Sequence, residues 1–504
     1  MNLKEKLGTA TLAVAAAVFV ALRFRHLADS CLWFDEIFGV HAAGMSFVEA
    51  LRFVAQDLIH PPLFYLLLKG WIALGGEGLF WLRFFSVFFM TLAVVPFVLL
   101  GRELKLSDWT IGLALFLFAV NGSLVKYAQE VRMYGPFLFF AVCSMWLFAR
   151  FLNLGKNIWI LTLVNLLLIY THYFGWLLVG AEVAAILILQ RIKIRQILIM
   201  FGILLAGFAP WAFAVFEAAR ANAGLGQNIG WIGRPDLRAL GEFLLDLVEP
   251  FYYQQSTAEP ASLYLLTVPL AVAAAGALAV YLAGWKRLDE AERKNLVLLT
   301  VLIALPIAAA FGLSWVLPYS IWGTRHLLFV FVPCALLAAT ALTRIRIGPL
   351  AAALTALVLI FCAIEFLAVA GRPAEPPIWC AWEALAAKVD RTKPSRIYVF
   401  EDLVAYDLWF ALRDAGPRIE VVRIDGIDEI PEDKSYFLPR GFDGVRRADV
   451  DAMTGDRFFV VYRDAVFNEK HPPLRQLVAK GYHIGEPVAY ETPGLNAFLV
   501  EVTK

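Results

Sequence analysis

The chain has 504 residues, of which 60% are hydrophobic and only 17% are charged, and its mean hydropathy is +0.68. A water-soluble globular protein needs far more polar surface, so the composition excludes that class and indicates a protein of the lipid bilayer. The net charge of +1 carries no basic excess, which argues against nucleic acid as a partner.

Apolar segments of membrane-spanning length recur along the chain until about residue 370. A hydrocarbon core of about 30 Å is crossed by about 20 residues of α-helix, and we therefore predict about eleven spans in a polytopic α-helical membrane protein. The predicted spans are 7–25, 79–100, 109–126, 133–151, 157–174, 176–190, 196–215, 262–284, 295–316, 326–343 and 348–370.

Clusters of lysine and arginine in the short loops between these spans fall on one predicted side of the membrane, whereas Lys126 and Arg132 break this trend. Lysine and arginine in short loops favour the cytoplasm. We therefore expect a multi-pass protein of the plasma (inner) membrane with a cytoplasmic N-terminus. An odd number of spans then makes the C-terminal region extracytoplasmic. The residues that set this orientation are Lys4, Lys6, Arg102, Lys105, Arg191, Lys193, Arg195, Lys286, Arg287, Arg293, Lys294, Arg344 and Arg346.

The first span has a basic start and an apolar run, as a secretory signal peptide does. Its apolar run is long and continues into Arg23-Phe24-Arg25 without a small-residue cleavage site. We therefore interpret the first span as a retained membrane anchor.

Residues 28–78 form the predicted first outer loop. Within it, Leu63 to Leu74 is apolar but too short to cross the bilayer, and a crossing there would place the basic residues after the next span on the wrong side. We predict that this segment is an interfacial helix opened by Pro61-Pro62, because proline is favourable in the first turn of a helix. A second helix is expected near Ser46 to Leu58.

Residues 371–504 differ in composition from the rest of the chain, with 22 acidic and 18 basic side chains. Short β-rich runs alternate there with segments of helical period, which predicts a small α/β domain. The domain has no GxGxxG or P-loop motif, so we assign it no chemistry of its own. Strands are expected at Arg396–Phe400, Ile419–Ile424, Arg457–Tyr462 and Ala497–Val502, and helices at Leu403–Arg413 and Leu474–Lys480.

The five cysteines show no CxxC or Cys/His spacing, so we expect no structural zinc site and interpret most of them as small apolar side chains. Cys31 and Cys380 both fall in stretches outside the membrane on the predicted outer side. A disulfide between these two is conceivable.

Ionisable side chains that cytoplasmic loops do not explain collect at the outer ends of the predicted spans. Such groups are costly near a membrane and usually line a functional cavity. They form five groups, at Asp35-Glu36, at His60, between Lys126 and Tyr134 (Tyr127, Glu130 and Arg132), at His172, and at Arg325-His326.

Each group also has a plain structural interpretation. Asp35 could cap a helix, His60 could be no more than a hydrogen-bonded interfacial histidine, and Glu130 could pair with Arg132. The functional alternatives are a general base or metal ligand at Asp35-Glu36 and a phosphate site at His60, next to a helix N-terminus. All five groups lie on one predicted side, which scattered core residues would not do.

The chain resembles the GT-C class of integral membrane glycosyltransferases, in particular bacterial relatives of protein O-mannosyltransferases and of lipid A aminoarabinose transferases (glycosyltransferase family 39). The resemblance covers about the first 340 residues and rests on five motifs in the matching order. These are Trp33-Phe34-Asp35-Glu36, His60-Pro61-Pro62-Leu63, Tyr127-Ala128-Gln129-Glu130-Val131-Arg132-Met133-Tyr134, Tyr170-Thr171-His172-Tyr173-Phe174-Gly175 and Arg325-His326-Leu327-Leu328.

The resemblance implies a sugar donor linked to a polyprenyl phosphate, an active site at the outer face, and inversion at the anomeric carbon. It implies that Asp35 is the general base, with Glu36 beside it. The donor phosphate would contact His60, where some relatives have lysine, together with Arg132 and Arg325. Other substrate contacts are expected from Tyr127, Glu130, His172 and His326. The acceptor could be a glycan, a lipid or a protein of the cell envelope.

The resemblance also leaves a divalent cation (Mg²⁺, Mn²⁺ or Zn²⁺) open, with Asp35, Glu36 and His172 as candidate ligands. It divides the chain into a transmembrane glycosyltransferase domain, 1–370, and an extracytoplasmic α/β domain, 371–504. A second outer loop, 216–261, contains a stretch rich in glycine and aromatic residues from Gly224 to Tyr253, where we expect the donor or acceptor site to be shaped.

Two rival interpretations remain at this point. A transporter or flippase for a lipid-linked or anionic substrate would also place ionisable groups near its spans, although typically at the membrane midplane and often with internal repeats. A catalytically inactive relative would only present its outer domain to partners; the presence of Asp35 argues against it.

Overall fold

The computed structural model describes residues 3–189, 193–221, 226–250, 261–345, 348–370, 377–427 and 435–504. The chain forms two compact units, each described here by itself. The helical unit comprises Met1–Leu27, Leu58–Asn222 and Ile232–Arg372. The sheet unit comprises Ala28–Asp57, Ala223–Trp231 and Pro373–Lys504. Residues 28–57 of the first predicted outer loop thus group with the C-terminal residues.

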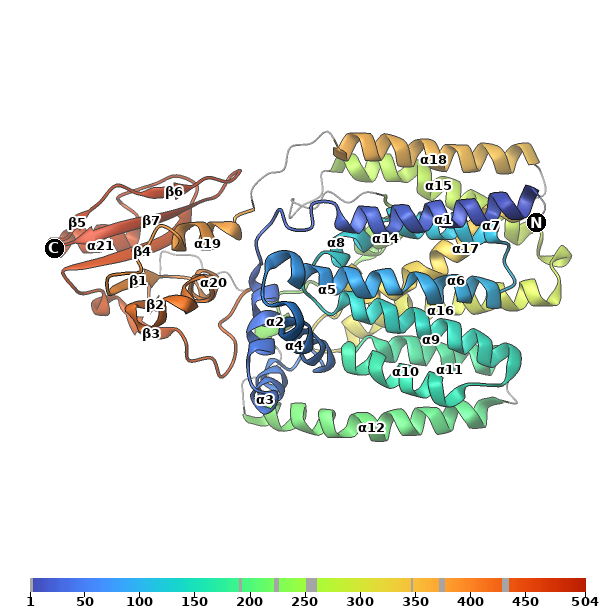
Figure 1. Ribbon diagram of the computed structural model, residues 1–504, viewed down its shortest axis with the longest axis horizontal. Helices are drawn as coiled ribbons and strands as arrows, with labels where there is room; N and C mark the ends of the chain where they lie inside the picture. Colours follow the sequence, from blue (N-terminus) through green and yellow to red (C-terminus); the bar gives the residue numbers. More distant parts are fainter. Residues whose placement is uncertain are drawn as a thin grey trace. The chain divides into compact units, whose positions relative to one another are not determined.

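The helical unit is a bundle of apolar helices, most of which have roughly aligned axes (Figure 1). Each of the predicted spans corresponds to helical structure, which confirms the expected fold class. The helices are α1 (Leu3–Phe24), α4 (Leu63–Gly75), α5 (Leu79–Leu92), α6 (Val94–Glu103), α7 (Asp108–Val120), α8 (Gly122–Ala128), α9 (Tyr134–Leu154), α10 (Ile158–Thr171), α11 (Gly175–Leu189), α12 (Ile194–Ala221), α14 (Leu237–Asp246), α15 (Ala261–Ala283), α16 (Glu290–Val316), α17 (Phe331–Arg344) and α18 (Gly348–Ala370), with 3₁₀ turns η2 (Trp285–Arg287) and η3 (Thr324–Val330).

Six helical stretches in the described part of the chain are long and apolar enough to cross a membrane by themselves. These are Lys6–Phe24, Leu79–Glu103, Tyr134–Leu154, Ile194–Ala221, Glu290–Val316 and Thr324–Arg344. Two further apolar helices, α7 and α10, are shorter than the predicted spans 109–126 and 157–174. In the first of these, Asn121 follows the last residue of α7 and accepts the Leu124 N–H with its side chain, which starts α8 as a separate helix.

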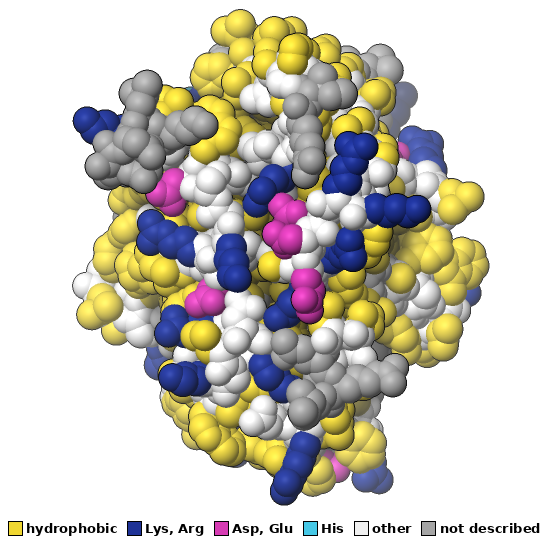
Figure 2. Space-filling view, turned by 90° about the vertical axis from the view of Figure 1, so that its right-hand side faces the viewer, with side chains coloured by type: hydrophobic (Ala, Val, Ile, Leu, Met, Phe, Trp, Pro, Cys, Tyr) yellow, Lys and Arg dark blue, Asp and Glu magenta, His cyan; other side chains and the backbone are white. Residues whose placement is uncertain are grey.

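One end of the bundle, which we call the basic end, gathers the connections that carry lysine and arginine. Figure 2 shows this end, with many Lys and Arg side chains among few acidic ones. Polar contacts join its connections: Arg344 pairs with Glu292 at 3.0 Å, and Lys294 Nζ donates to Asn153 Oδ1 at 3.3 Å. Helices α9 and α17 end here, so they begin at the opposite end of the bundle. Arg191 and Arg346 of the predicted pattern lie outside the described residues.

The sheet unit contains a seven-stranded mixed sheet in the order β3-β2-β1-β4-β7-β5, with β6 also paired to β7. Strands β1 to β4 pair in parallel, and β7 runs antiparallel to β4, β5 and β6. The predicted α/β character is therefore present. The strands are β1 (Ser395–Val399), β2 (Ile419–Asp425), β3 (Arg446–Asp449), β4 (Arg457–Asp464), β5 (His483–Ile484), β6 (Val488–Tyr490) and β7 (Asn496–Thr503); the helices are α2 (Phe34–Gly44), α3 (Phe47–Asp57), α13 (Gly226–Ile229), α19 (Cys380–Ala386), α20 (Asp402–Leu412) and α21 (Pro472–Ala479), with 3₁₀ turns η4 (Arg413–Arg418) and η5 (Val450–Ala452).

Both faces of the central strands are buried, as expected for parallel strands covered by helices. Tyr398, Val422 and Val460 share one face with Leu474 and Leu477 of α21. The helix α20 packs against β2 and also against α2 of the first outer loop. The sheet thus supplies a rigid platform for a helix that lies far earlier in the sequence.

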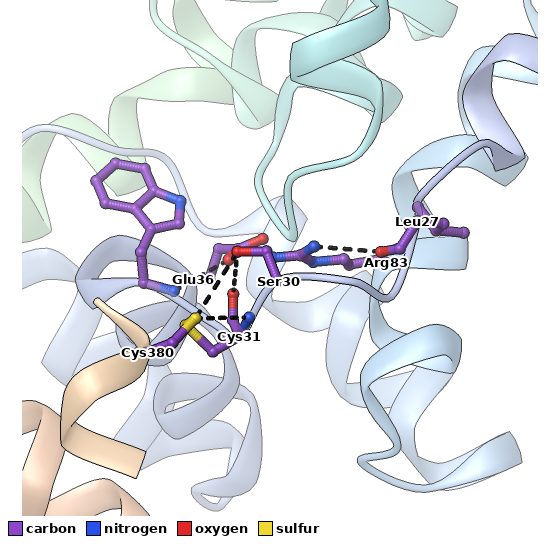
Figure 3. The surroundings of a disulfide bond; sticks show 7 residues. Leu27, Ser30, Cys31, Glu36, Arg83 and Cys380 are labelled. Atoms are coloured by element: carbon purple, nitrogen blue, oxygen red, sulfur yellow. Dashed lines mark hydrogen bonds between the residues drawn. A yellow bond between two sulfur atoms is a disulfide. The ribbon is translucent and has the colours of Figure 1, made fainter. Parts of the chain in front are cut away.

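A disulfide joins the segment between α1 and α2 to the C-terminal part of the chain within the sheet unit. Cys31 and Cys380 are bonded, and the Cys31 N–H also donates to the Cys380 sulfur at 3.1 Å (Figure 3). The sequence left this bond as a conceivable pairing only. Since Cys31 lies three residues before Phe34, the first residue of α2, the bond tethers the start of that helix to α19.

Candidate active site

Five side chains of the helical unit form what we call the cationic cluster: His60, Arg132, His172, Arg325 and His326. They come from four separate stretches of the chain, at the ends of α4, α9, α10 and in η3. All of these positions are at the end of α9 and α17 opposite to the basic end. The sequence-predicted residues of this unit therefore meet in one place.

His60 is held by the two prolines that follow it. A residue before proline avoids the α conformation, so His60 lies in the connection before α4. A guanidinium nitrogen of Arg132 donates to His60 Nε2 at a long 3.4 Å, and the His60 and His172 rings are 6.3 Å apart. Arg132 is buried, with 3% of its surface exposed.

His172 ends α10 in an extended conformation, and its backbone N–H still bonds to Leu168. Its Nδ1 accepts from the Phe174 N–H at 3.1 Å, which leaves Nε2 as the nitrogen that carries a proton in the neutral ring. The rings of His172 and His326 are 5.5 Å apart, and Phe137 lies 4.8 Å from the ring of His172. A hydrogen-bond donor of His172 is thus held between aromatic rings.

His326 follows Arg325 in the turn η3. Its Nδ1 lies 3.1 Å from the carbonyl oxygen of Ile321, to which a neutral ring donates, so its Nε2 carries the free lone pair. Arg325 interacts electrostatically with both His172 and His326. The cluster therefore contains two charged arginines, an imidazole that can donate a hydrogen bond (His172) and one that can accept a hydrogen bond (His326).

Tyr127 lies near the end of α8, and the connection from α8 to α9 carries Glu130 and Arg132. Ser86 Oγ donates to the carbonyl oxygen of Glu130 at 2.5 Å and also lies 3.2 Å from that of Arg132, which holds this turn against α5. The Tyr127 ring lies 5.0 Å from Tyr134, and Tyr127 interacts electrostatically with Glu130 and Arg325. Tyr127 and Glu130 thus adjoin the cationic cluster.

Asp35 and Glu36 belong to the sheet unit, in the first turn of α2. Glu36 is fully buried, and its carboxylate accepts the Trp33 N–H at 3.1 Å, so Glu36 rather than Asp35 caps the helix. Asp35 is partly exposed. A carboxylate in the first turn is favoured by the helix dipole, and Asp35 is the better placed of the two for contact with a substrate.

The helix α20 places a second carboxyl group beside Asp35. The Phe34 and Tyr406 rings pack at 5.1 Å, which brings the residues that follow them, Asp35 and Asp407, near each other. Asp407 is 3% exposed, and neither of its oxygens has a hydrogen-bond partner in the described structure. Burial, with the charge of Asp35 second, raises the pKa of Asp407 well above its ordinary value.

No model of a known protein family matches the sequence, and no curated protein does. Among solved structures, the chain is similar to ArnT from Cupriavidus metallidurans bound to undecaprenyl phosphate, with a TM-score of 0.56 and 14% identity over 97% of this chain and 98% of that one. The apo state of the same protein gives a TM-score of 0.53 at 13% identity over 97% and 98%.

The chain is also similar to the oligosaccharyltransferase of Archaeoglobus fulgidus in complex with Zn and sulfate, with a TM-score of 0.51 and 12% identity over 97% of this chain and 72% of that one. These neighbours are GT-C glycosyltransferases. The chain has the GT-C fold. The likeness spans nearly all of it, so the C-terminal residues are part of the shared architecture, and the chain is an integral multi-pass membrane protein.

The residues of this GT-C protein give weak support to a metal site. In the described ranges no three His, Cys, Asp or Glu side chains are arranged to hold a metal ion. Of the candidate ligands, Glu36 is engaged as a helix cap, while Asp35 and His172 belong to different units.

The sequence analysis did not single out two fully buried polar residues of the helical unit, Arg23 and Glu182. Arg23 was taken as the end of the first span, yet it is fully buried and donates to the carbonyl oxygens of Phe19 and Ala119. Glu182 lies in the middle of α11 and is also fully buried. A single acidic residue inside an apolar run is the signal that would have found it.

Proposed function

We propose that this protein is a membrane glycosyltransferase that moves a sugar from a polyprenyl-phosphate donor to an acceptor hydroxyl at the outer face of the membrane. The observation that carries the proposal is the cationic cluster. Two arginines and three histidines at one end of an apolar bundle match a phosphate group attached to a lipid. The GT-C fold supports the same reaction class.

The chemistry needs little acid catalysis, because a lipid phosphate is already a good leaving group. It does need positive charge near the departing oxygen, and Arg132 and Arg325 supply permanent charge that no physiological pH removes. His172 adds a directed N–H donor. His60 interacts with Arg132 and stands where some relatives have lysine, so it would orient the phosphate more than neutralise it.

Asp35 is the proposed general base. It would accept the proton of the acceptor hydroxyl as that oxygen attacks the anomeric carbon, while the bond from that carbon to the phosphate oxygen breaks. A single displacement of this kind inverts the anomeric centre, through a transition state with oxocarbenium character. Tyr127 and Glu130, next to the cluster, are proposed to contact the sugar.

An apolar cavity of the helical unit is the proposed place for part of the donor's lipid chain. It is lined mainly by apolar side chains of α7, α8, α15, α17 and α18. Helix α8 also carries Tyr127, and α17 follows directly after η3 with Arg325. A polyprenyl chain in this cavity would bring its phosphate towards the cationic cluster.

The basic end of the bundle supports the proposed orientation. Lysine and arginine at this end favour the cytoplasm, which would place the cationic cluster at the opposite, outer face. The N-terminus would then be cytoplasmic. A polyprenyl-phosphate donor presented at the outer face would be held close to its acceptor by the shared membrane.

Binding of undecaprenyl phosphate to the purified protein tests the proposal. We expect Arg132→Gln to weaken binding roughly 10- to 100-fold, because a charge-assisted hydrogen bond contributes about 1.5–3 kcal/mol. Lys156→Gln, an exposed substitution in the connection between α9 and α10, is the matched control and should bind as the wild type does. Equal affinity for wild type, Arg132→Gln and Lys156→Gln would contradict the proposed phosphate site.

A further inference from the structure

Three polar side chains meet in the interior of the helical unit, far from both ends of their helices. Ser144 lies in α9, Asn165 in α10 and Glu182 in α11, and all three are fully buried. Ser144 Oγ lies 2.5 Å from Asn165 Oδ1 and 2.6 Å from Glu182 Oε1. Asn165 Nδ2 lies 2.8 Å from Glu182 Oε2. We call these three residues the buried ring.

Counting hydrogens fixes the protonation state of the buried ring. Each of the three short contacts needs one hydrogen between its two polar atoms. The serine hydroxyl supplies one, and the asparagine amide group supplies one. The third hydrogen can come only from the carboxyl group of Glu182. With an ionised Glu182, one contact would hold two acceptors at about 2.5–2.8 Å with no hydrogen between them.

This count does not depend on which way the Asn165 amide is turned. If its oxygen and nitrogen are exchanged, the nitrogen donates to Ser144 Oγ and the oxygen faces Glu182 Oε2. The ring is then again one hydrogen short unless Glu182 carries it. The second amide hydrogen of Asn165 in the described orientation points to the sulfur of Met200 at 3.8 Å, outside the ring.

The surroundings of Glu182 favour the neutral form as well. Its hydrogen-bond partners in the described structure are Ser144 and Asn165, neither of which is charged. A carboxylate in the apolar interior of a membrane protein without a cationic partner costs several kcal/mol, whereas a fully hydrogen-bonded carboxylic acid does not.

We propose that Glu182 is a neutral carboxylic acid that closes a ring of three hydrogen bonds with Ser144 and Asn165, and that this ring positions the helix ends that form the cationic cluster. The positioning part rests on the proposed donor-phosphate site, whereas the protonation of Glu182 does not. Glu182, Ser144 and Asn165 are thus positioning residues and touch no substrate.

The connectivity explains how the ring acts on the site. Arg132 lies two residues before α9, His172 directly follows α10, and α11 begins three residues later. The ring is 10 residues into α9 from Tyr134, roughly 15 Å at 1.5 Å per residue, and 7 residues before His172. One ring therefore sets the axial register of three helices, and a slip of one of them would move Arg132 relative to His172.

The satisfied ring also distinguishes Glu182 from a proton carrier of a transporter. A carrier has to exchange its proton with water or substrate, and so it faces a water-filled path. Glu182 is fully buried and its carboxyl oxygens are both used within the ring. Hydrogen bonds to the neighbouring helices α9 and α10 explain why an acidic residue lies in the middle of α11.

Infrared spectroscopy of the full-length protein in lipid nanodiscs tests the protonation directly. The wild-type spectrum minus that of Glu182→Gln should contain the carbonyl band of a carboxylic acid at neutral pH. Carboxylate bands in that difference spectrum, with no carboxylic-acid band, would overturn the proposal. This measurement needs no substrate and no activity.

Substitution tests the ring as a positioning device. Glutamine can replace a neutral glutamic acid in the ring, because its amide donates to Ser144 and accepts from Asn165. Glu182→Gln should therefore bind undecaprenyl phosphate within about twofold of the wild type and keep its thermal midpoint, whereas Glu182→Ala should weaken binding at least about fivefold and lower the midpoint. Equal behaviour of Glu182→Gln and Glu182→Ala in binding would refute the positioning role.

The outcomes separate the two proposals. If the wild type does not bind undecaprenyl phosphate at all, the proposed function fails. The infrared band and the difference in thermal midpoint between Glu182→Gln and Glu182→Ala then still decide whether the neutral ring exists.

Discussion

At the scale of single residues, the environment of the Asp407 carboxyl group is expected to lower the free energy of unfolding. It is buried in α20 without a hydrogen bond to either oxygen in the described structure, and Asp35 is an electrostatic neighbour. Burial raises the pKa of Asp407 well above its ordinary value. The folded state therefore binds this proton more tightly than the unfolded chain does.

The sign of the pH dependence follows. A group whose pKa is raised by folding adds stability at pH values below its unfolded pKa, which is about 3.9 for aspartate, and this stability is lost as the pH rises through the folded pKa. At neutral pH Asp407 thus lowers the free energy of unfolding. Protonated Asp407 is uncharged, so its burial lowers the free energy of unfolding much less than burial of the carboxylate does.

We predict that Asp407→Asn raises the thermal midpoint of the full-length protein at neutral pH, in line with a gain of about 1–3 kcal/mol for removing a buried charge. Near pH 3 the gain should disappear. Asp456→Asn, at an exposed position of the same unit, is the control and should change the midpoint at neither pH. A lower midpoint for Asp407→Asn at neutral pH would show that the carboxylate is used in the fold.

The sequence predicted candidate site residues correctly where ionisable side chains lie near the ends of the spans. His60, Arg132, His172 and His326 were chosen from the sequence, and the structure brings them together. Asp407 could not be found in this way, because the sequence predicted a helix there but did not show that α2 packs against it. The contact between α2 and α20 joins residues about 370 positions apart, such as Phe34 and Tyr406.

At the scale of elements, the apolar cavity makes a prediction about the donor lipid. Ala338 of α17 lines the cavity. We predict that Ala338→Trp weakens binding of undecaprenyl phosphate about 10-fold or more, because the indole fills space that the chain would occupy. Binding of a phosphate with a short prenyl chain should be unchanged, since the cationic cluster is left intact.

Ala352→Trp, on an exposed face of α18, is the matched control for added bulk. It should bind both lipids as the wild type does. Equal loss of long-chain and short-chain binding in Ala338→Trp would mean that the substitution disturbs the site itself. No loss with either lipid would remove the cavity as the place of the polyprenyl chain.

The long apolar helices were easier to predict than α2 and the short strands. Hydropathy located each span, and the predicted helices near Ser46 to Leu58 and after Pro61-Pro62 are present as α3 and α4. The sequence did not reveal α2, whose run of small and aromatic residues has no clear period. The short strands β3, β5 and β6 were also missed, because edge strands of two to four residues carry too little pattern.

At the scale of the whole molecule, the unexpected feature is that residues 28–57 belong to the sheet unit. Composition placed the boundary where the spans end, near residue 370, and could not show that an early loop joins the late domain. The disulfide between Cys31 and Cys380 makes this association covalent. As a result, Asp35 is carried by a unit built largely from the C-terminal residues.

Transfer of sugar from a panel of radiolabelled polyprenyl-phosphate sugars by the purified full-length protein tests the central claim most directly. We predict transfer with at least one donor in the presence of an acceptor hydroxyl, and a loss of at least about 100-fold for Asp35→Asn, in which the base is removed. Asp456→Asn should retain full transfer. Full transfer by Asp35→Asn would contradict its role as base. No turnover with any donor, despite binding of undecaprenyl phosphate, would contradict the glycosyltransferase account and favour a transporter of lipid-linked substrates.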